Sequence, residues 1–234
     1  MTVASPLAAV GGTAPRPRPD FHAISRPASA MTGDLYLALE TGEGWLFGLG
    51  DVTGHGLDAA IYMMMIHEEV ERLATSTRSL SALVSGLHES LREELPSRWF
   101  ASLVLARLGS DGDLEVVNAG HWPPLLWRDR GALETLAPNG PIVGALPGSR
   151  WSSTRARLER RDALVLFSDG VTEAASPAGE EFGSARLGEL VHRIGAQPAA
   201  AIVRQVVDEV DRFRGGVPSA DDVTVLVVRS GASA

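Results

Sequence analysis

Apolar side chains recur every three to four residues in four stretches of the chain, which is the spacing of one helix face. The first stretch, residues 57–77, is apolar on all sides between Ala59 and Ile66, so we expect this half to be buried on more than one side. The other three stretches are residues 80–91, 186–194 and 199–213. The pattern therefore predicts four helices, which follow one another as an early pair and a late pair.

Shorter apolar runs between glycines and charged turns predict β-strands. Residues 33–39 and 45–49 flank the tight turn at 42–44 and form a hairpin. The remaining strands are residues 21–26, 100–108, 113–119, 125–127, 132–136, 151–158, 163–167 and 223–228. We expect residues 151–158 to pair with residues 163–167, and the apolar run at the end of the chain to lie in the centre of a sheet.

This order of elements is strands, two helices, many antiparallel strands, two helices and one strand. Stacking two sheets and covering each with one helix pair buries all the apolar faces economically. We therefore predict an α+β fold, a four-layer α/β/β/α sandwich of two mostly antiparallel sheets flanked by helix pairs. Residues 21–230 form this domain, after a disordered Pro-rich leader at 1–20 and before a flexible tail at 231–234.

Composition excludes several classes of protein. The 234 residues include no cysteine, which removes disulfides, thiolate metal sites and cysteine nucleophiles. The formal net charge is −8, whereas a nucleic-acid binder presents a basic face. No apolar run approaches the roughly 18 residues of a membrane span, and no signal peptide is evident. We expect a cytoplasmic protein that binds neither nucleic acid nor membrane.

Four aspartates, Asp34, Asp51, Asp169 and Asp221, lie beside a glycine or a flexible loop at the edge of a predicted strand. Asp51 belongs to GDVTGHG, whose glycines let a ligand approach the main chain closely. The predicted hairpin places Asp34, at the start of one strand, near Asp51, at the end of the other. Taken singly, each aspartate is equally consistent with an ordinary turn, and Asp51 with a helix cap.

Aspartates that converge repel one another. Two unit charges about 4 Å apart repel by about 4 kcal/mol at an effective dielectric constant near 20. Protons or cations relieve that repulsion, and sites made only of oxygen favour Mg²⁺, Mn²⁺ or Ca²⁺ over zinc. Two such ions side by side make a site for phosphoryl hydrolysis.

Five motifs in order resemble the metal-dependent PPM/PP2C-type serine/threonine phosphatases, in their bacterial sporulation and stress-response branch (SpoIIE/RsbU-like). They are TGDLY at 32–36, GDVTGHG at 50–56, NAGHWPPLL at 118–126, FSDGVTEA at 167–174 and DDVTVLVV at 221–228. The resemblance covers residues 26–228 and implies a β-sandwich with two Mn²⁺ or Mg²⁺ ions between its sheets. One departure is Thr32, which stands where the family usually has the first glycine of a pair.

The resemblance also implies residue roles. Asp51 would bridge the two ions, and the backbone carbonyl of Val52 would bind one of them. Asp169 and Asp221 would hold the other ion, and Asp34 would act through metal-bound water. Asp222 would be a supporting residue, since it occupies a position that is often Asn or Asp. The implied activity is hydrolysis of a phosphoserine or phosphothreonine by attack of a metal-bound water.

The implied substrate is a phosphorylated anti-anti-sigma protein of the STAS type, which acts in sigma-factor partner switching. The sequence leaves open an activator protein, a homodimer, and the choice between Mn²⁺ and Mg²⁺.

Two histidines lie in the motifs. His55, beside Asp51, is a catalytic candidate together with Asp51 and Asp169, because it could donate a proton to the leaving serine oxygen. It could equally orient the loop by hydrogen bonding. His121 is interpreted as the anchor of a loop between strands.

Other classes remain for comparison. An aspartyl-phosphate hydrolase needs a nucleophilic aspartate two residues before Asp169, where this chain has Phe167. A nucleotide hydrolase of the Walker type needs a lysine loop, which the sequence lacks. The remaining alternative is a non-catalytic partner-switch binding protein that keeps the phosphatase fold, and the intact aspartates favour catalysis over it.

Overall fold

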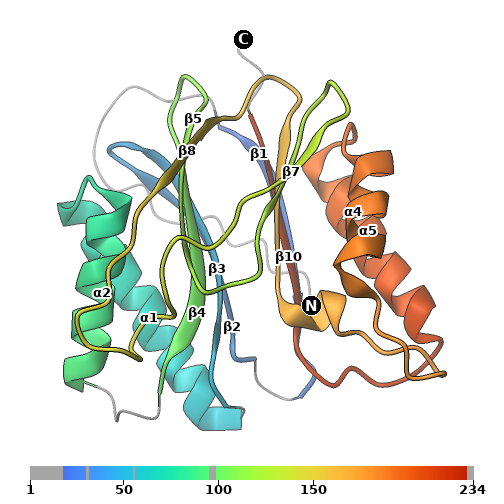
Figure 1. Cartoon of the computed structure of the whole chain (residues 1–234), viewed down its shortest axis with the longest axis horizontal. Helices are drawn as coiled ribbons and strands as arrows, with labels where there is room; N and C mark the ends of the chain where they lie inside the picture. The colour runs from blue at the N-terminus through green and yellow to red at the C-terminus, as the bar shows by residue number, and fades with distance from the viewer. Residues whose placement is uncertain (1–17, 30–31, 55, 95–98, 231–234) are drawn as a thin grey trace.

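A computed structural model describes residues 18–29, 32–54, 56–94 and 99–230 of the chain. In it, two five-stranded antiparallel sheets pack face to face, and helices cover the outer face of each (Figure 1). The fold is α+β, as predicted. The proposed leader and tail lie largely or wholly outside the described residues.

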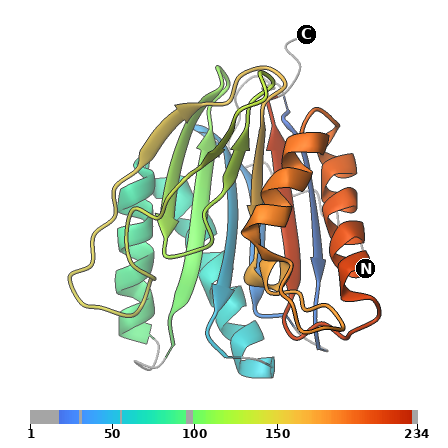
Figure 2. The same cartoon turned by 45° about the vertical axis from the view of Figure 1, so that its right-hand side comes forward.

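The first sheet has the strand order β1-β10-β9-β6-β7. Its strands are β1 (Asp20–Arg26), β10 (Val223–Arg229), β9 (Ala163–Phe167), β6 (Leu125–Trp127) and β7 (Leu133–Thr135). The last strand of the chain therefore lies inside the sheet, as its apolar pattern predicted. Figure 2 shows α4 (Gly183–Ile194) and α5 (Ala199–Arg214) covering this sheet, with α5 along β1 and β10. The single-turn helix α3 (Asp169–Thr172) follows β9.

The second sheet has the order β2-β3-β4-β5-β8. Its strands are β2 (Asp34–Thr41), β3 (Gly44–Val52), β4 (Ala101–Leu108), β5 (Asp113–Ala119) and β8 (Thr154–Arg157). The helices α1 (Gly56–Ser76) and α2 (Leu80–Glu94) cover it. In the described part of the chain, no helix combines the length and apolar character that crossing a bilayer requires.

The core has three layers, which follow from the alternation of side chains along each strand. One face of each sheet packs on its helices, where Leu35 and Leu103 contact the α1–α2 side. The opposite faces meet between the sheets, where Phe47 and Leu49 join Leu164 of the other sheet. Apolar side chains thus fill the space between the two sheets along the middle of the sandwich.

One predicted pairing is wrong. β8 pairs with β5, whereas β9 pairs with β10 and β6, so the chain crosses from one sheet to the other at residues 159–162. Every residue of β9 is buried, as in a strand covered on both faces, but β8 alternates exposed and half-buried residues, as an edge strand does. Asp162 holds the crossing, since its carboxylate accepts hydrogen bonds from the Arg128 side chain and the backbone N–H of Asp129.

The first half of α1 is also less buried than predicted. Its inner face packs on the second sheet through Ala59 and Ile66, but Ile61 and Met64 point away and are exposed. An apolar pattern on all sides therefore does not mean burial on all sides here.

Candidate metal centre

The β2–β3 hairpin brings the first two candidate carboxylates together. Asp34 and Asp51 are direct cross-strand partners, so their side chains lie on the same face of the sheet. A Cβ added at Gly33 would lie 3.5 Å from Asp51 Oδ1 and 3.6 Å from the carbonyl oxygen of Val52. Both oxygens therefore face the same small space, and a side chain at position 33 would fill it. The predicted proximity of Asp34 and Asp51 is confirmed.

The other sheet supplies Asp169 and Asp221 at the same end of the sandwich. Asp169 begins α3, separated from the end of β9 only by Ser168, and Asp221 lies just before the neighbouring strand β10. A Cβ at Gly170 would lie only 2.1 Å from the carbonyl oxygen of Asp222, so this close approach of two backbones requires glycine. The Ser168 hydroxyl adds a hydrogen bond to that same carbonyl oxygen at 3.0 Å.

Burial and mutual repulsion shift these carboxyl groups in one direction. Burial, together with the charge of Asp51, raises the pKa of Asp34 to about 8, although hydroxyls of neighbouring residues act against this shift. Burial raises the pKa of Asp51 to about 7, and the charges of Asp169 and Asp221 contribute. Burial and the charge of Asp221 raise the pKa of Asp169 to about 6. The two sheets therefore place carboxylates close enough to oppose one another's ionisation.

The donor chemistry fits hard cations. Among the described residues, no three Asp, Glu or His side chains stand close enough together to enclose a metal ion. Yet the available donors are all oxygens, and the buried Oδ2 of Asp34 has no hydrogen-bond partner among the described residues. A divalent cation would also offset the burial and the mutual repulsion that raise the three pKa values, because it favours the ionised carboxylates. By these criteria the residues suit Mg²⁺ or Mn²⁺.

Asp222 does not share the proposed role of Asp221, because its carboxylate is engaged in hydrogen bonds. Its buried carboxylate accepts hydrogen bonds from the backbone N–H of Ala28 at 2.7 Å, the Thr32 hydroxyl at 2.6 Å and the backbone N–H of Gly33 at 2.8 Å. The Thr32 hydroxyl oxygen in turn accepts the backbone N–H of Asp34 at 3.0 Å. Asp222 thus ties the segment that carries Asp34 to the other sheet, and Thr32, the departure from the usual glycine, is one of the ties.

Replacing Thr32 by valine is expected to weaken Mn²⁺ binding by about 10-fold, which is typical of losing a group that orients a metal ligand. Valine keeps the branched shape but loses both hydrogen bonds, whereas Thr32→Ser keeps the hydroxyl and should bind as the wild type does. Isothermal titration with Mn²⁺ measures both variants. Equal affinities for the valine and serine variants would show that the tie does not matter.

His121 is buried between the sheets. Its Nδ1 lies 2.7 Å from the hydroxyl of Ser102, the cross-strand partner of Asp51, and its backbone N–H donates to Asn118 Oδ1 at 2.8 Å. Burial lowers its pKa to about 4, so the ring is neutral. These contacts agree with the interpretation of His121 as a loop anchor. His55, the catalytic candidate, lies outside the described residues.

Sequence reasoning missed three of the side chains that shape this end of the sandwich, namely Ser102, Ser168 and Thr224. Thr224 donates its backbone N–H to the Ser168 hydroxyl at 2.9 Å and so joins β10 to the start of α3. Ser168 and Thr224 lie in motifs quoted above, but only the fold shows that they meet. No local signal marked Ser102.

Comparison with known proteins agrees with this geometry. The family model for stage II sporulation protein E (SpoIIE) matches residues 41–231. The phosphoserine phosphatase RsbU of Bacillus subtilis is 26% identical over 212 residues, which are 90% of this chain and 63% of RsbU.

Two solved structures show the same fold. The SiaA-PP2C domain of Pseudomonas aeruginosa has a TM-score of 0.81 at 21% identity, over 90% of this chain and 85% of that one. The catalytic domain of the serine/threonine phosphatase PstP, solved with two manganese ions, has a TM-score of 0.69 at 16% identity. That match covers 89% of this chain and 96% of that one.

The sandwich of two antiparallel sheets with flanking helices is the fold of the PP2C-type phosphatases. Within this class, the chain belongs to the SpoIIE family. It spans between 37% and 63% of the length of the curated relatives that it matches.

Proposed function

We propose that this chain is a metal-dependent protein serine/threonine phosphatase. The observation that carries the proposal is that Asp34, Asp51 and Asp169, from two sheets, lie at the same end of the sandwich, with pKa values raised by burial and by the charges of neighbouring carboxylates. Such an arrangement costs stability unless it holds cations, which makes a structural purpose alone a poor explanation.

Most of these residues would bind the metal ions directly, and one would act through water. Asp51, the carbonyl oxygen of Val52, Asp169 and Asp221 would hold two Mn²⁺ or Mg²⁺ ions directly. Asp34, deeper and with a free buried oxygen, would act from behind through water. When bound, the ions supply Lewis-acid chemistry: they acidify water and neutralise the oxygens of a phosphate.

Hydrogen bonds from Thr53 and to Asp222 fix the two segments that carry the proposed metal-site residues of the second sheet. Thr53 donates two hydrogen bonds, from its N–H and its hydroxyl, to the carbonyl oxygen of Phe100 at 3.0 Å each. These bonds fix the turn directly after Val52 and so hold its carbonyl in place. Asp222 fixes the segment before Asp34 from the opposite sheet.

The proposed substrate is the phosphoserine or phosphothreonine of an anti-anti-sigma protein, in a cytoplasmic partner-switching system. Support comes from RsbU, which is named a phosphoserine phosphatase and matches 90% of this chain. His55 would assist departure of the serine oxygen or orient the loop.

Hydrolysis of p-nitrophenyl phosphate, with and without Mn²⁺, tests the catalytic proposal. The wild type is expected to need Mn²⁺, and Asp169→Asn is expected to lose about 100-fold or more in rate, since it removes a ligand outright. Absence of metal-dependent hydrolysis of both this compound and a phosphoprotein would favour a non-catalytic partner-switch protein.

A further inference from the structure

The outer face of α1 changes character along its length. In its first half, Leu57, Ile61 and Met64 are 60%, 45% and 58% exposed, and their spacing of four and three residues puts them on one side of the helix. Only one other large apolar side chain among the described residues, Leu146, is exposed. We call Leu57, Ile61 and Met64 the apolar stripe.

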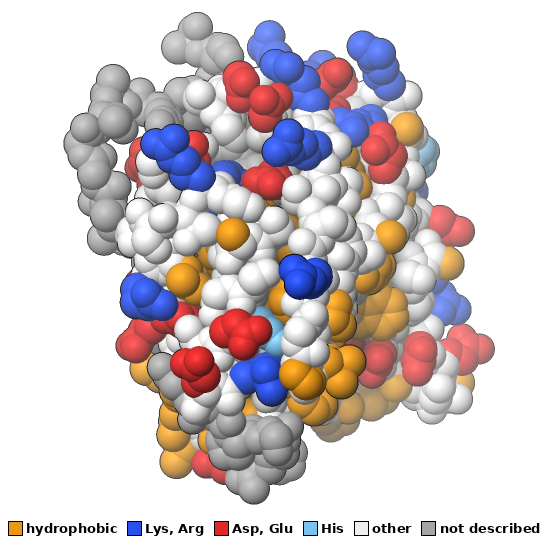
Figure 3. Space-filling view, turned by 60° about the vertical axis from the view of Figure 1, so that its left-hand side comes forward, with side chains coloured by type: hydrophobic (Ala, Val, Ile, Leu, Met, Phe, Trp, Pro, Cys, Tyr) orange, Lys and Arg blue, Asp and Glu red, His pale blue; other side chains and the backbone are white. Residues whose placement is uncertain are grey.

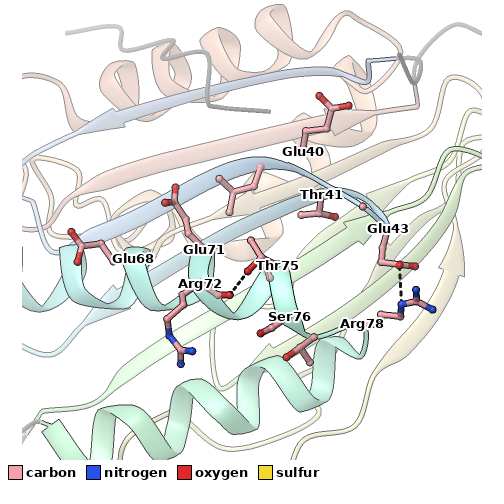
Figure 4. A pocket seen from close by; sticks show the side chains of 13 residues that line it. Glu40, Thr41, Glu43, Glu68, Glu71, Arg72, Thr75, Ser76 and Arg78 are labelled. Atoms are coloured by element: carbon pink, nitrogen blue, oxygen red, sulfur yellow. Dashed lines mark hydrogen bonds and ion pairs between the residues drawn. The ribbon is translucent and has the colours of Figure 1, made fainter. Parts of the chain in front are cut away.

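The second half of α1 is polar instead. Together with the β2–β3 hairpin it lines a groove of about 640 Å³ (Figure 4), and Glu68 and Glu71 are among the side chains there. The space-filling view of the side that carries α1 and α2 shows hydrophobic side chains gathered toward its lower end (Figure 3). The stripe is therefore a local feature and not the general character of this helix.

The stripe begins next to the candidate metal centre. α1 starts four residues after Val52, and a Cβ at Gly33 would lie 3.7 Å from Ala59 Cβ and 3.5 Å from Asp51 Oδ1. The first turn of the helix thus touches the segment that carries Asp34. At 1.5 Å per residue, Leu57 and Met64 are only about 10 Å apart along the helix.

We propose that the apolar stripe is the docking surface for the phosphoprotein substrate. This inference rests on the proposed function. A protein whose phosphoserine reaches Asp51 covers the surface around it, and a typical interface buries about 800 Å² on each partner, a disc of roughly 16 Å radius. A stripe that starts within one helical turn of the centre falls inside that disc.

The negative charge of the chain supports a phosphoprotein substrate as the occupant of the apolar stripe. The chain carries a formal net charge of −8, so its overall field does not draw in a dianionic phosphoserine, and the attraction of cations bound in the site is screened beyond about 10 Å. Affinity for the protein must then come from short-range contacts, and exposed Leu, Ile and Met side chains supply apolar area. Methionine also adapts its shape to a partner, which suits an interface that must release its product.

The double variant Ile61→Gln/Met64→Gln tests the surface. Its probes are p-nitrophenyl phosphate and a folded STAS-type anti-anti-sigma protein phosphorylated on serine. We expect kcat/KM for the phosphoprotein to fall by about 10- to 100-fold through KM, as loss of two apolar contacts predicts. Hydrolysis of the small ester should stay within about twofold, because neither side chain belongs to the metal centre.

The matched control is Glu68→Gln/Glu71→Gln, in the polar half of the same helix, which should leave both activities unchanged. A second measurement does not depend on turnover: calorimetric binding of the same phosphoprotein in EDTA should weaken by about 10-fold in the stripe variant only.

The outcomes separate the two proposals. A wild type without metal-dependent hydrolysis of either probe contradicts the proposed function, while the binding measurement still tests the stripe. Unchanged binding and unchanged kcat/KM in the stripe variant overturn the docking surface. A wild-type dimer that the stripe variant alone disrupts, seen by analytical ultracentrifugation, would assign the stripe to a second copy of the chain and overturn it as well.

Discussion

Asparagine at position 51 is expected to reduce Mn²⁺-dependent hydrolysis of p-nitrophenyl phosphate by more than about 100-fold, whereas Asp34→Asn should cost only about 10-fold. In the proposed site Asp51 binds both cations directly, and loss of such a ligand should cost more than the roughly 10- to 100-fold that follows removal of an outer partner. Asp51 Oδ1 shares its space with the Val52 carbonyl oxygen, which is why we propose Asp51 as a direct ligand, while Asp34 is more deeply buried.

Steady-state rates across a Mn²⁺ titration measure this difference. Asp34→Asn should recover part of its activity at high Mn²⁺ concentration, and Asp51→Asn should not. Asp113→Asn, which changes an exposed carboxylate at the start of β5, is the control for a change of charge alone. Equal losses of hydrolysis rate in the two variants would contradict the proposal that Asp51 binds the ions directly and Asp34 acts through water.

Sequence analysis succeeded where the decisive contacts are local. The hairpin of residues 33–39 and 45–49 follows from two apolar runs and a glycine turn, and its pairing alone places Asp34 opposite Asp51. The helix pairs and the interior position of β10 likewise follow from periodicity and from an unbroken apolar run.

The errors concern contacts between distant segments. Residues 151–158 and 163–167 look like a hairpin because a charged four-residue turn joins them. In the fold, however, β8 pairs with β5 of one sheet, and β9 pairs with β10 and β6 of the other. Similarly, no pattern indicates that Asp222 accepts hydrogen bonds from residues about 190 positions earlier. Periodicity reports which side of an element is apolar, but it does not report what covers that side, as Ile61 and Met64 show.

The metal-free protein is expected to become less stable as pH rises from about 4 to about 8. Asp34, Asp51 and Asp169 have pKa values raised to about 8, 7 and 6, so the folded state binds more protons than the unfolded state in this range. Stability from these groups is therefore fully present below the unfolded pKa, near 4, and is lost as pH rises through the folded values. Mn²⁺ should reverse this trend, because it binds the ionised carboxylates.

Asp51→Asn isolates the effect from the titration of all other groups. In EDTA near pH 4, close to the unfolded pKa, Asp51 has cost the fold little of its stability, so wild type and variant should melt at similar temperatures. At pH 8 the free energy of unfolding of the variant should exceed that of the wild type by on the order of 2 kcal/mol, after allowing for partial solvent screening. The variant should therefore melt about 4–8 °C higher. In saturating Mn²⁺ the order should invert, because the variant has lost a ligand. If Asp51→Asn instead lowered the melting temperature equally at both pH values, the carboxylate would be stabilising the fold by itself, and its burial beside Asp34 and Asp169 would no longer indicate a cation site.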